Sequence, residues 1–391
     1  MAFQRDRVFW TISAQIALVN FYLGGFGPAQ PLLREDQGTS LTVAGLHGTA
    51  MGVASIIAGA LNSPVVHRFG RSRAAWLGLG LFAIGIVMFV YCPPVQLTLL
   101  ATLLGGIGTS FVINNMVTGI SHHYKEDAAI ALPQSNSIGS AGYVTGTLFV
   151  GTLAGTSISW RYGLLLAAPL SLILYLVGRE KGAEEHVPDV EGPQRGKLSP
   201  QFWWAWIGFV ACISSEFATT FWAAALLRER VGSTAAISTV CIVALGTGMG
   251  IGRWFGGPVL KRYKLDHQLQ IIISTQFIGF AIFWFSHNLL LSLFSLFTMG
   301  LGISMQFALA SIRLIGLSDN RPDLAIGKSS LAAGLAIGGA PFLLGVLGDS
   351  LGISRAYIMV PVLIAIAFIV VVVIPTNVSQ RKVHEAEGIS E

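Results

Sequence analysis

The chain has 391 residues, of which 53% are hydrophobic and only 11% are charged. A soluble domain carries about 25% charged residues, so the composition excludes an ordinary soluble enzyme and a disordered chain. The formal net charge of +5 comes from short basic clusters between apolar runs, which excludes a basic face for nucleic acid. The composition therefore predicts an all-α membrane protein with many spans in a lipid bilayer.

Apolar runs long enough to cross a bilayer follow one another along the whole chain. About 20 mainly apolar residues are needed to span the hydrocarbon. The first run contains Gly24, Gly25, Gly27 and Pro28, which predict a bent helix. The twelve predicted spans are Val8–Leu33, Val43–Val66, Ala74–Tyr91, Val95–Ser121, Ala128–Gly155, Tyr162–Gly178, Phe202–Leu227, Ala235–Leu260, Gln270–Phe285, Leu289–Ile312, Leu324–Leu347 and Ala356–Ile374.

The distribution of basic residues predicts the orientation of these spans. Most of the 24 lysine and arginine residues lie in segments on the side of the N-terminus, and cytoplasmic loops are enriched in such residues. We therefore expect both termini in the cytoplasm and a multi-pass protein of the cell (inner) membrane. One long polar stretch, 179–200, predicts a cytoplasmic linker. It would join a six-helix bundle of residues 1–178 to a second one of residues 201–391, which ends in a short cytoplasmic tail.

The two predicted bundles are similar in sequence. At an offset of about 194 residues, Leu32–Glu35 aligns with Leu226–Glu229 and Pro64 aligns with Pro258. An even number of spans separates the copies, so both would insert in the same orientation as a parallel 6+6 repeat. Bundles related in this way rock around a central site and give alternating access, which indicates a secondary transporter.

Twelve spans, a parallel repeat and a cytoplasmic linker resemble the major facilitator superfamily over the whole chain. The signature of that family, between its second and third helices, is a glycine followed by Asp-Arg-x-Gly-Arg-Arg. Here Gly59 is followed by the run His67-Arg68-Phe69-Gly70-Arg71-Ser72-Arg73, with His67 in the place of the aspartate. The resemblance implies a gating role for His67, Arg68, Gly70 and Arg71, and for Arg262 in the second copy.

A finer resemblance covers the seventh and eighth spans. The residues Ser215-Glu216-Phe217 and Trp222, followed by the glycines around Arg253, are similar to the pattern in fucose–proton symporters. The run Gly252-Arg253-Trp254-Phe255-Gly256 is similar to organic-anion carriers, and in them this arginine holds a carboxylate. Unlike those sugar symporters, this chain has no acidic residue in the first or fourth predicted span.

Glu216 is the only acidic residue deep within a predicted span. A dry surrounding favours the neutral form of a carboxyl group and water favours the ionised form. Alternating access changes these surroundings, so we predict that Glu216 couples transport to protons. The alternative is a structural carboxyl group that is hydrogen-bonded to a neighbouring helix.

Two arginines also fall within spans. Arg253, in the eighth span, is a candidate for binding an anionic solute; the alternative is that its side chain snorkels to the cytoplasmic interface. Its depth differs from that of Glu216 by about seven residues, or roughly 10 Å. For Arg313, near the cytoplasmic end of the tenth span, we expect snorkelling.

Neutral polar and aromatic side chains complete the predicted binding site. In a water-filled cavity they would bind a polyol or a carboxylate, and otherwise they would form hydrogen bonds between helices. The predicted substrate-binding residues besides Arg253 are Asn20, Tyr22, Asn114, Asn115, Asn136, Trp222 and Gln306.

These patterns together predict a proton-coupled secondary transporter that moves a small solute by a rocker-switch mechanism. The solute would be an organic anion or a sugar-like molecule. The alternatives are a proton-driven antiporter that exports drugs or metabolites and, less favoured, a lipid flippase. No nucleophile or metal-ligand set can be placed in the spans, so we expect no enzyme activity and no cofactor or metal. We expect a monomer.

Overall fold

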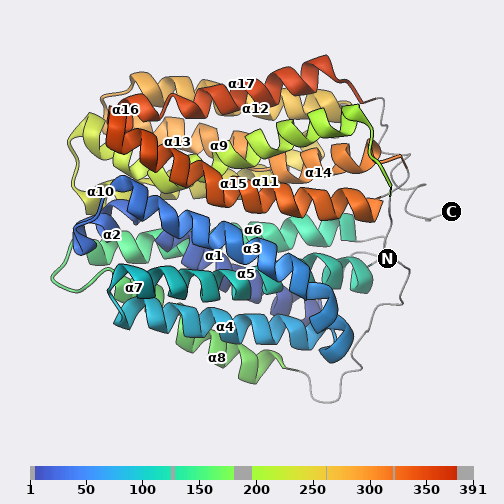
Figure 1. Ribbon diagram of the computed structural model, residues 1–391, viewed down its shortest axis with the longest axis horizontal. Coiled ribbons are helices and arrows are strands. Elements are labelled where there is room, and N and C mark those ends of the chain that lie inside the picture. Colours follow the sequence, from blue (N-terminus) through green and yellow to red (C-terminus); the bar gives the residue numbers. More distant parts are fainter. Residues whose placement is uncertain (1–4, 125–127, 180–195, 261, 320–321, 377–391) are drawn as a thin grey trace.

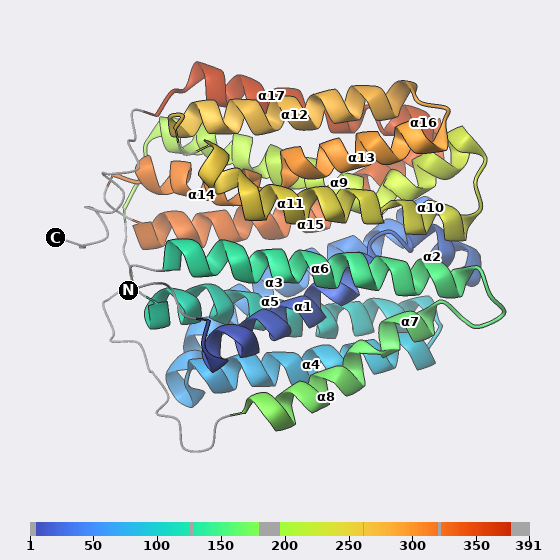
Figure 2. The same cartoon turned by 180° about the vertical axis from the view of Figure 1, so that it is seen from behind.

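The computed structural model describes residues 5–124, 128–179, 196–260, 262–319 and 322–376. The side chains of a few helical residues, His67 among them, lie outside the described part. The described residues form seventeen helical segments that run along one common direction (Figures 1 and 2). Their bounds are Arg7–Phe26 (α1), Gln30–Gln37 (α2), Leu41–Phe69 (α3), Arg71–Tyr91 (α4), Val95–Tyr124 (α5), Ala128–Ala154 (α6), Arg161–Leu165 (α7), Ala167–Gly178 (α8), Pro200–Val231 (α9), Ala235–Cys241 (α10), Val243–Leu260 (α11), Leu265–Phe285 (α12), Leu289–Ile303 (α13), Gln306–Gly316 (α14), Pro322–Leu351 (α15), Ile353–Ala356 (α16) and Met359–Val373 (α17).

Eleven helices or pairs of helices in the described residues are long and apolar enough to cross a membrane. The fifth predicted span, α6, has 27 residues but is not among them. Its first half carries the polar residues Gln134, Asn136 and Ser140. It nevertheless runs parallel to the other spans through the middle of the molecule (Figure 2). The predicted all-α, multi-span membrane fold is confirmed.

The first span ends where the sequence predicts a bend. Helix α1 ends at Phe26, and α2 begins at Gln30 after the segment Gly27–Pro28–Ala29. Proline has no backbone N–H to continue a helical ladder, so a break at this segment is expected. The described residues at the start of α1 and at the end of α17 lie at the same end of the bundle (Figure 1). We refer to it as the cytoplasmic end and to the opposite end as the outer end.

Helices α1 and α6 cross with their backbones in contact. A β-carbon at Gly142 would overlap the carbonyl oxygen of Ala17, and one at Gly146 would overlap the carbonyl oxygen of Phe21. Gly24 on α1 lies in the same way against the backbone of Tyr143. Small residues allow this close approach between membrane helices. The crossing fixes the face that α6 turns toward the centre of the molecule.

Helices α1 to α8 lie on one side of the molecule and α9 to α17 on the other (Figures 1 and 2). The two sets meet mainly where α3 packs against α15 and where α6 packs against α11. Within the second set, helix α9 packs against α15 and α17. The cavity of the candidate functional site lies at the interface between these two sets of helices.

Arg313 is not exposed at the cytoplasmic interface, so the expectation that it snorkels is wrong. Its side chain is 3% exposed, and its Nε donates to Asp266 Oδ1 at 3.0 Å. One terminal nitrogen donates to the carbonyls of Val370, at 3.3 Å, and Ile374. Thr376 also donates to Asp266, through its backbone N–H and its hydroxyl. These bonds hold the guanidinium inside the protein and tie α12, α14 and α17 together.

Candidate functional site

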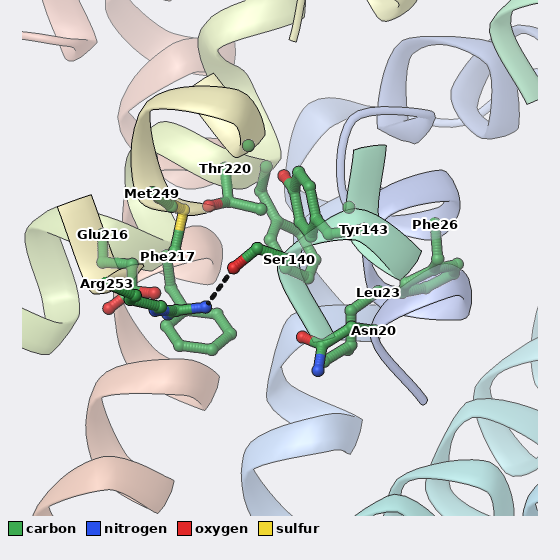
Figure 3. A pocket seen from close by; sticks show the side chains of 13 residues that line it. Asn20, Leu23, Phe26, Ser140, Tyr143, Glu216, Phe217, Thr220, Met249 and Arg253 are labelled. Atoms are coloured by element: carbon green, nitrogen blue, oxygen red, sulfur yellow. Dashed lines mark hydrogen bonds between the residues drawn. The ribbon is translucent and has the colours of Figure 1, made fainter. Parts of the chain in front are cut away.

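A small cavity of about 60 Å³ lies between α1, α6, α9 and α11 (Figure 3). Two of these helices come from each side of the molecule. The lining residues are Asn20, Leu23, Phe26 and Gly27 of α1 and its end, Ser140 and Tyr143 of α6, Glu216, Phe217, Thr220 and Phe221 of α9, and Gly246, Met249 and Arg253 of α11. Of the residues that the sequence predicts for proton coupling or solute binding, the structure brings three to this cavity, namely Glu216, Arg253 and Asn20.

Glu216 lies at the middle of α9, a helix of 32 residues. Its side chain is half-buried and lines the cavity. Within the part of the chain that the structure describes, its carboxylate has no hydrogen-bond or ion-pair partner, although it interacts electrostatically with Arg253. A carboxylate that is deep in the membrane but free to accept a proton or a cation is costly to keep, so its presence points to a role in the cavity.

Arg253 joins the two sides of the molecule. Its Nη1 donates to the hydroxyl of Ser140 on α6 at 2.9 Å, drawn as the dashed line in Figure 3. Its Nε donates to the carbonyl of Ser304 at 3.2 Å. The Ser140 hydroxyl in turn donates to the carbonyl of Asn136 at 3.2 Å. The guanidinium has five N–H donors, and these two bonds leave others for a solute.

The carbonyl that Arg253 uses lies at a helix break. Helix α13 ends at Ile303 and α14 begins at Gln306, with Ser304 and Met305 in a turn between them. A break leaves carbonyl groups without an intrahelical partner and exposes the negative end of the α13 dipole. The guanidinium of Arg253 is therefore held by a non-helical backbone segment. Such segments occur within membranes where they are buried in protein or line a cavity.

The glycine run of α11 explains how Arg253 reaches both partners. Gly246 and Gly250 lie against Tyr143 and Ser140 of α6, whereas Gly248 and Gly252 lie against the end of α13 and the turn that follows it. Residues four apart share one helix face, and residues two apart lie on opposite faces. The alternating glycines thus let α11 pack closely on two sides. Arg253 follows directly after it.

Aromatic rings lie beside the polar groups of the cavity. Along α1 and α9, the lining residues Phe26 and Phe221 lie closer to the outer end than Asn20 and Glu216, and Phe217 follows Glu216 directly. The ring of Phe26 on α1 meets that of Phe221 on α9 edge to face, with centroids 6.1 Å apart. Phe217 lies 6.5 Å from Phe221 between ring centroids. The arrangement suits a solute with a charged end and an apolar body.

Four of the predicted solute-binding residues face away from this cavity. Tyr22 is buried beneath Phe26, and their rings are stacked with centroids 5.1 Å apart. Trp222 is fully buried, and its indole N–H donates to the carbonyl of Pro341 on α15 at 2.9 Å. The remaining two, Asn115 and Gln306, are also buried and bind neighbouring amide side chains at 2.9 Å and 2.6 Å. Trp222, Asn115 and Gln306 thus form hydrogen bonds inside the helix packing, and Tyr22 packs against a neighbouring ring.

Asn114 and Asn136 are half-buried and do not line the cavity. The side chain of Asn136 donates to the carbonyl of Leu132 at 3.2 Å, one turn earlier on α6. Its own carbonyl accepts the hydroxyl of Ser140, so Asn136 touches the site through its backbone.

The predicted gating residues lie at the cytoplasmic end. Gly70 separates α3 from α4 and has a φ of 86°, a left-handed conformation that favours glycine. Arg68 is exposed above the ring of Phe69, and Arg262 is exposed above the ring of Tyr263. Arg71 is half-buried at the start of α4. The side chain of His67 lies outside the described residues, and a gating role for this group stays a prediction.

Sequence reasoning did not include Ser140, Tyr143 or Phe26 in the site. Ser140 and Tyr143 lie next to the glycines through which α6 packs against α1. Helix α11 packs against the neighbouring face of α6, at these two residues. The spacing of Gly139, Gly142 and Gly146 in the sequence could have indicated these residues. A helix face of small residues packs closely against another helix, so the side chains next to that face lie toward the centre of the molecule.

The fold and this cavity together define a multi-span membrane carrier whose central site is shared by two sets of helices. A family model described as Major Facilitator Superfamily matches residues 12–315. This match covers more than half of the chain, so the chain belongs to the major facilitator superfamily. It is a secondary transporter of a small solute and not an enzyme.

The chain is 22% identical over 355 residues to the inner membrane transport protein YdhP of Escherichia coli (strain K12). That match covers 87% of this chain and 89% of YdhP. Among solved structures, it is similar to a bacterial homologue of the human lysosomal transporter Spinster in an inward-facing, occupied conformation, with a TM-score of 0.74, 15% identity, and 95% and 97% of the two chains covered. For the nucleoside transporter NupG the TM-score is 0.69 at 14% identity, with 94% and 97% covered. These structures share the fold alone.

Proposed function

We propose that this protein is a proton-coupled carrier of a small solute with an anionic group and an apolar body. The observation that carries the proposal is that Glu216 and Arg253 face one cavity, while the carboxylate of Glu216 has no partner among the described residues. The proposal includes rocking of a bundle of residues 1–178 against a bundle of residues 201–391 around this cavity. Glu216 would then meet water from each side in turn.

Arg253 is the proposed anion-binding residue. Its bonds to Ser140 and Ser304 hold the guanidinium at the cavity wall with donors to spare. A carboxylate or phosphate forms charge-assisted bonds that are roughly twice as strong as those to a neutral hydroxyl, so an anionic solute would compete well against Ser140. The resemblance of Gly252–Gly256 to organic-anion carriers supports the same role. A neutral, sugar-like solute would not need this arginine.

The anion proposal is tested with a thermal-shift screen of metabolites in detergent, because a ligand of the folded state raises its stability. We expect the stabilising compounds to be carboxylates or phosphates with an apolar part. Arg253→Gln is expected to weaken their affinity about tenfold or more, and Arg253→Lys to restore only part of it. The matched control is Arg355→Gln, an exposed arginine at the outer end. Unchanged affinity in Arg253→Gln would contradict the proposal.

Glu216 is the proposed proton-coupling residue. Glu216→Gln imitates the neutral carboxyl group, so it is expected to abolish accumulation driven by a pH gradient and to retain counterflow exchange. The measurement is uptake of a solute from the screen into proteoliposomes, with and without an imposed pH gradient. Glu229→Gln removes an exposed carboxylate at the end of the same helix and is the control. Gradient-driven accumulation by Glu216→Gln would show that the coupling site lies elsewhere.

A second candidate function is proton-driven export of a cationic aromatic drug or metabolite. The observation that favours it is the unpaired carboxylate of Glu216 next to the rings of Phe217 and Phe221, which suit a cation with an aromatic body. In that case the thermal-shift screen would select cations, and Glu216→Gln would abolish their binding as well as their transport. Polar groups on both sides of the cavity make it a poorer match to a lipid flippase.

A further inference from the structure

The outer end contains a carboxylate that caps a helix from the other side of the molecule. Asp349 lies in the last turn of α15 and is exposed. Its Oδ1 accepts the backbone N–H of Leu41 at 2.8 Å. Its Oδ2 accepts the backbone N–H of Thr42 at 2.8 Å and the hydroxyl of Thr42 at 2.6 Å. Leu41 and Thr42 are the first two residues of α3.

The cap that α3 carries in its own sequence leaves these two N–H groups unsatisfied. The hydroxyl of Ser40 accepts only the N–H of Val43, at 3.3 Å. The first N–H groups of a helix have no partner within the helix, and its N-terminus carries a partial positive charge. Asp349 supplies both the missing acceptors and the favourable charge. A helix of one side of the molecule therefore completes its N-terminus with a residue from the other side.

The cap lies at the outer tip of a close helix crossing that reaches the middle of α3, where a β-carbon at Gly52 would overlap the Gly334 carbonyl oxygen. Gly45 and Gly48 pack against Pro341, and a β-carbon at Gly45 would lie 2.9 Å from the Pro341 carbonyl oxygen. Closer to the cytoplasm, Gly59 has open space around its Cα. The other charged contact between the two sides at the outer end, Arg228 with Glu35, joins side chains that are 41% and 48% exposed. Such exposed pairs contribute little.

We propose that Asp349 is a gating residue whose carboxylate latches the outer end closed. Opening the cavity to the outer side requires the start of α3 to separate from the end of α15, and this separation breaks all three bonds at once. Asp349 therefore sets the equilibrium between the outer-closed and the outer-open protein. The inference rests on alternating access of the two bundles, but not on the identity of the solute or on proton coupling.

The test measures distances between spin labels by double electron–electron resonance in the full chain, without any solute. Labels at Ser157 and His287, which are exposed at the outer end on different sides of the molecule, report opening there, and labels at Phe69 and Lys264 report the cytoplasmic end. Cys92, the half-exposed native cysteine, is replaced by serine. Asp349→Ala and Asp349→Asn are compared with wild type, with Asp349→Glu as the conservative variant.

We expect the outer-open population to rise about tenfold or more in Asp349→Ala, because the bonds to a charged group are lost. Outer distances would lengthen while cytoplasmic distances shorten, a pattern that simple loss of stability would not produce. Thr42→Val, which keeps the backbone bonds, would give a smaller shift, and the control Glu229→Gln none. Unchanged distances at both ends in Asp349→Ala and Asp349→Asn would overturn the latch. That result would leave the proposed function, tested by solute binding and uptake, unaffected.

Discussion

Asp6 shows how one side chain at the cytoplasmic end joins two helices. It caps α1 by accepting the backbone N–H of Phe9 at 3.0 Å. It also accepts the hydroxyl of Tyr124 and lies 2.5 Å from His123 Nε2, both at the end of α5. Burial alone would raise the pKa of Asp6, but the bonds from Tyr124, Phe9 and His123 together lower it below its usual value. The ionised form is therefore favoured in the folded protein.

This shift predicts how stability depends on pH. A carboxyl group whose pKa is lowered by folding stabilises the protein above its unfolded pKa, near 3.9, and the contribution is lost as the pH falls through the folded value. Asp6→Ala should lower stability at neutral pH by about 1 kcal/mol through loss of the cap. Asp6→Asn keeps an acceptor at the cap, so it should lose less stability at neutral pH and should remove the part of the acid dependence that comes from Asp6. Thermal unfolding in detergent between pH 7 and about pH 3 measures both.

The control for this measurement is Glu229→Gln, which removes a carboxylate without a described partner. It should leave both the stability and its pH dependence close to those of wild type. A difference in unfolding temperature between Asp6→Asn and wild type that stays constant over the whole pH range would contradict the prediction that the ionised carboxylate of Asp6 stabilises the protein.

At the residue scale, the sequence identifies a cavity residue when residues of its type are rare within membrane spans. Glu216 and Arg253 stand out because charged groups are costly within a span, and both line the cavity. Trp222 does not stand out in that way from Phe221, its neighbour. Successive residues on a helix point about 100° apart, so only the packing of α9 decides that Phe221 faces the cavity while Trp222 faces α15.

At the element scale, the crossing of α1 and α6 depends on residues without side chains. A β-carbon at Gly146 would overlap the backbone of Phe21, whereas Gly80 on α4 has open space around it. Gly146→Ala should therefore destabilise the protein by about 1–3 kcal/mol, as overpacking does. Gly80→Ala should instead stabilise it by roughly 0.5 kcal/mol, because alanine loses less backbone entropy. The unfolding temperature is expected to fall in Gly146→Ala and to rise in Gly80→Ala. A fall of equal size in both variants would contradict the role of Gly146 in the crossing.

Breaks in the spans differ in how far the sequence predicts them. The break between α1 and α2 follows from Gly27 and Pro28, because proline cannot continue the hydrogen-bond ladder. The break between α13 and α14 has no proline within it, and the apolar run Leu289–Ile312 predicts a single span. Here the turn at Ser304 is stabilised from outside, by Arg253, and a bond between distant residues leaves no local signal.

At the scale of the whole molecule, composition and the period of the apolar runs suffice for the fold class and the family. These features are set by the thickness of the bilayer and are averaged over hundreds of residues. The set of residues that line the cavity depends instead on which faces of α1, α6, α9 and α11 meet. Side-chain polarity alone does not determine these faces in a protein whose outer surface is as apolar as its interior.

The polarity of α6 has a consequence for how the protein is made. Insertion into the membrane favours apolar segments one at a time, and α6 is the predicted span that is missing from the eleven apolar helices of the described chain. Its glycine face fits the backbone of α1, a helix synthesised more than a hundred residues earlier. We therefore expect α6 to insert most readily while α1 is close enough to pair with it. The same contact also sets the face that α6 turns toward the cavity.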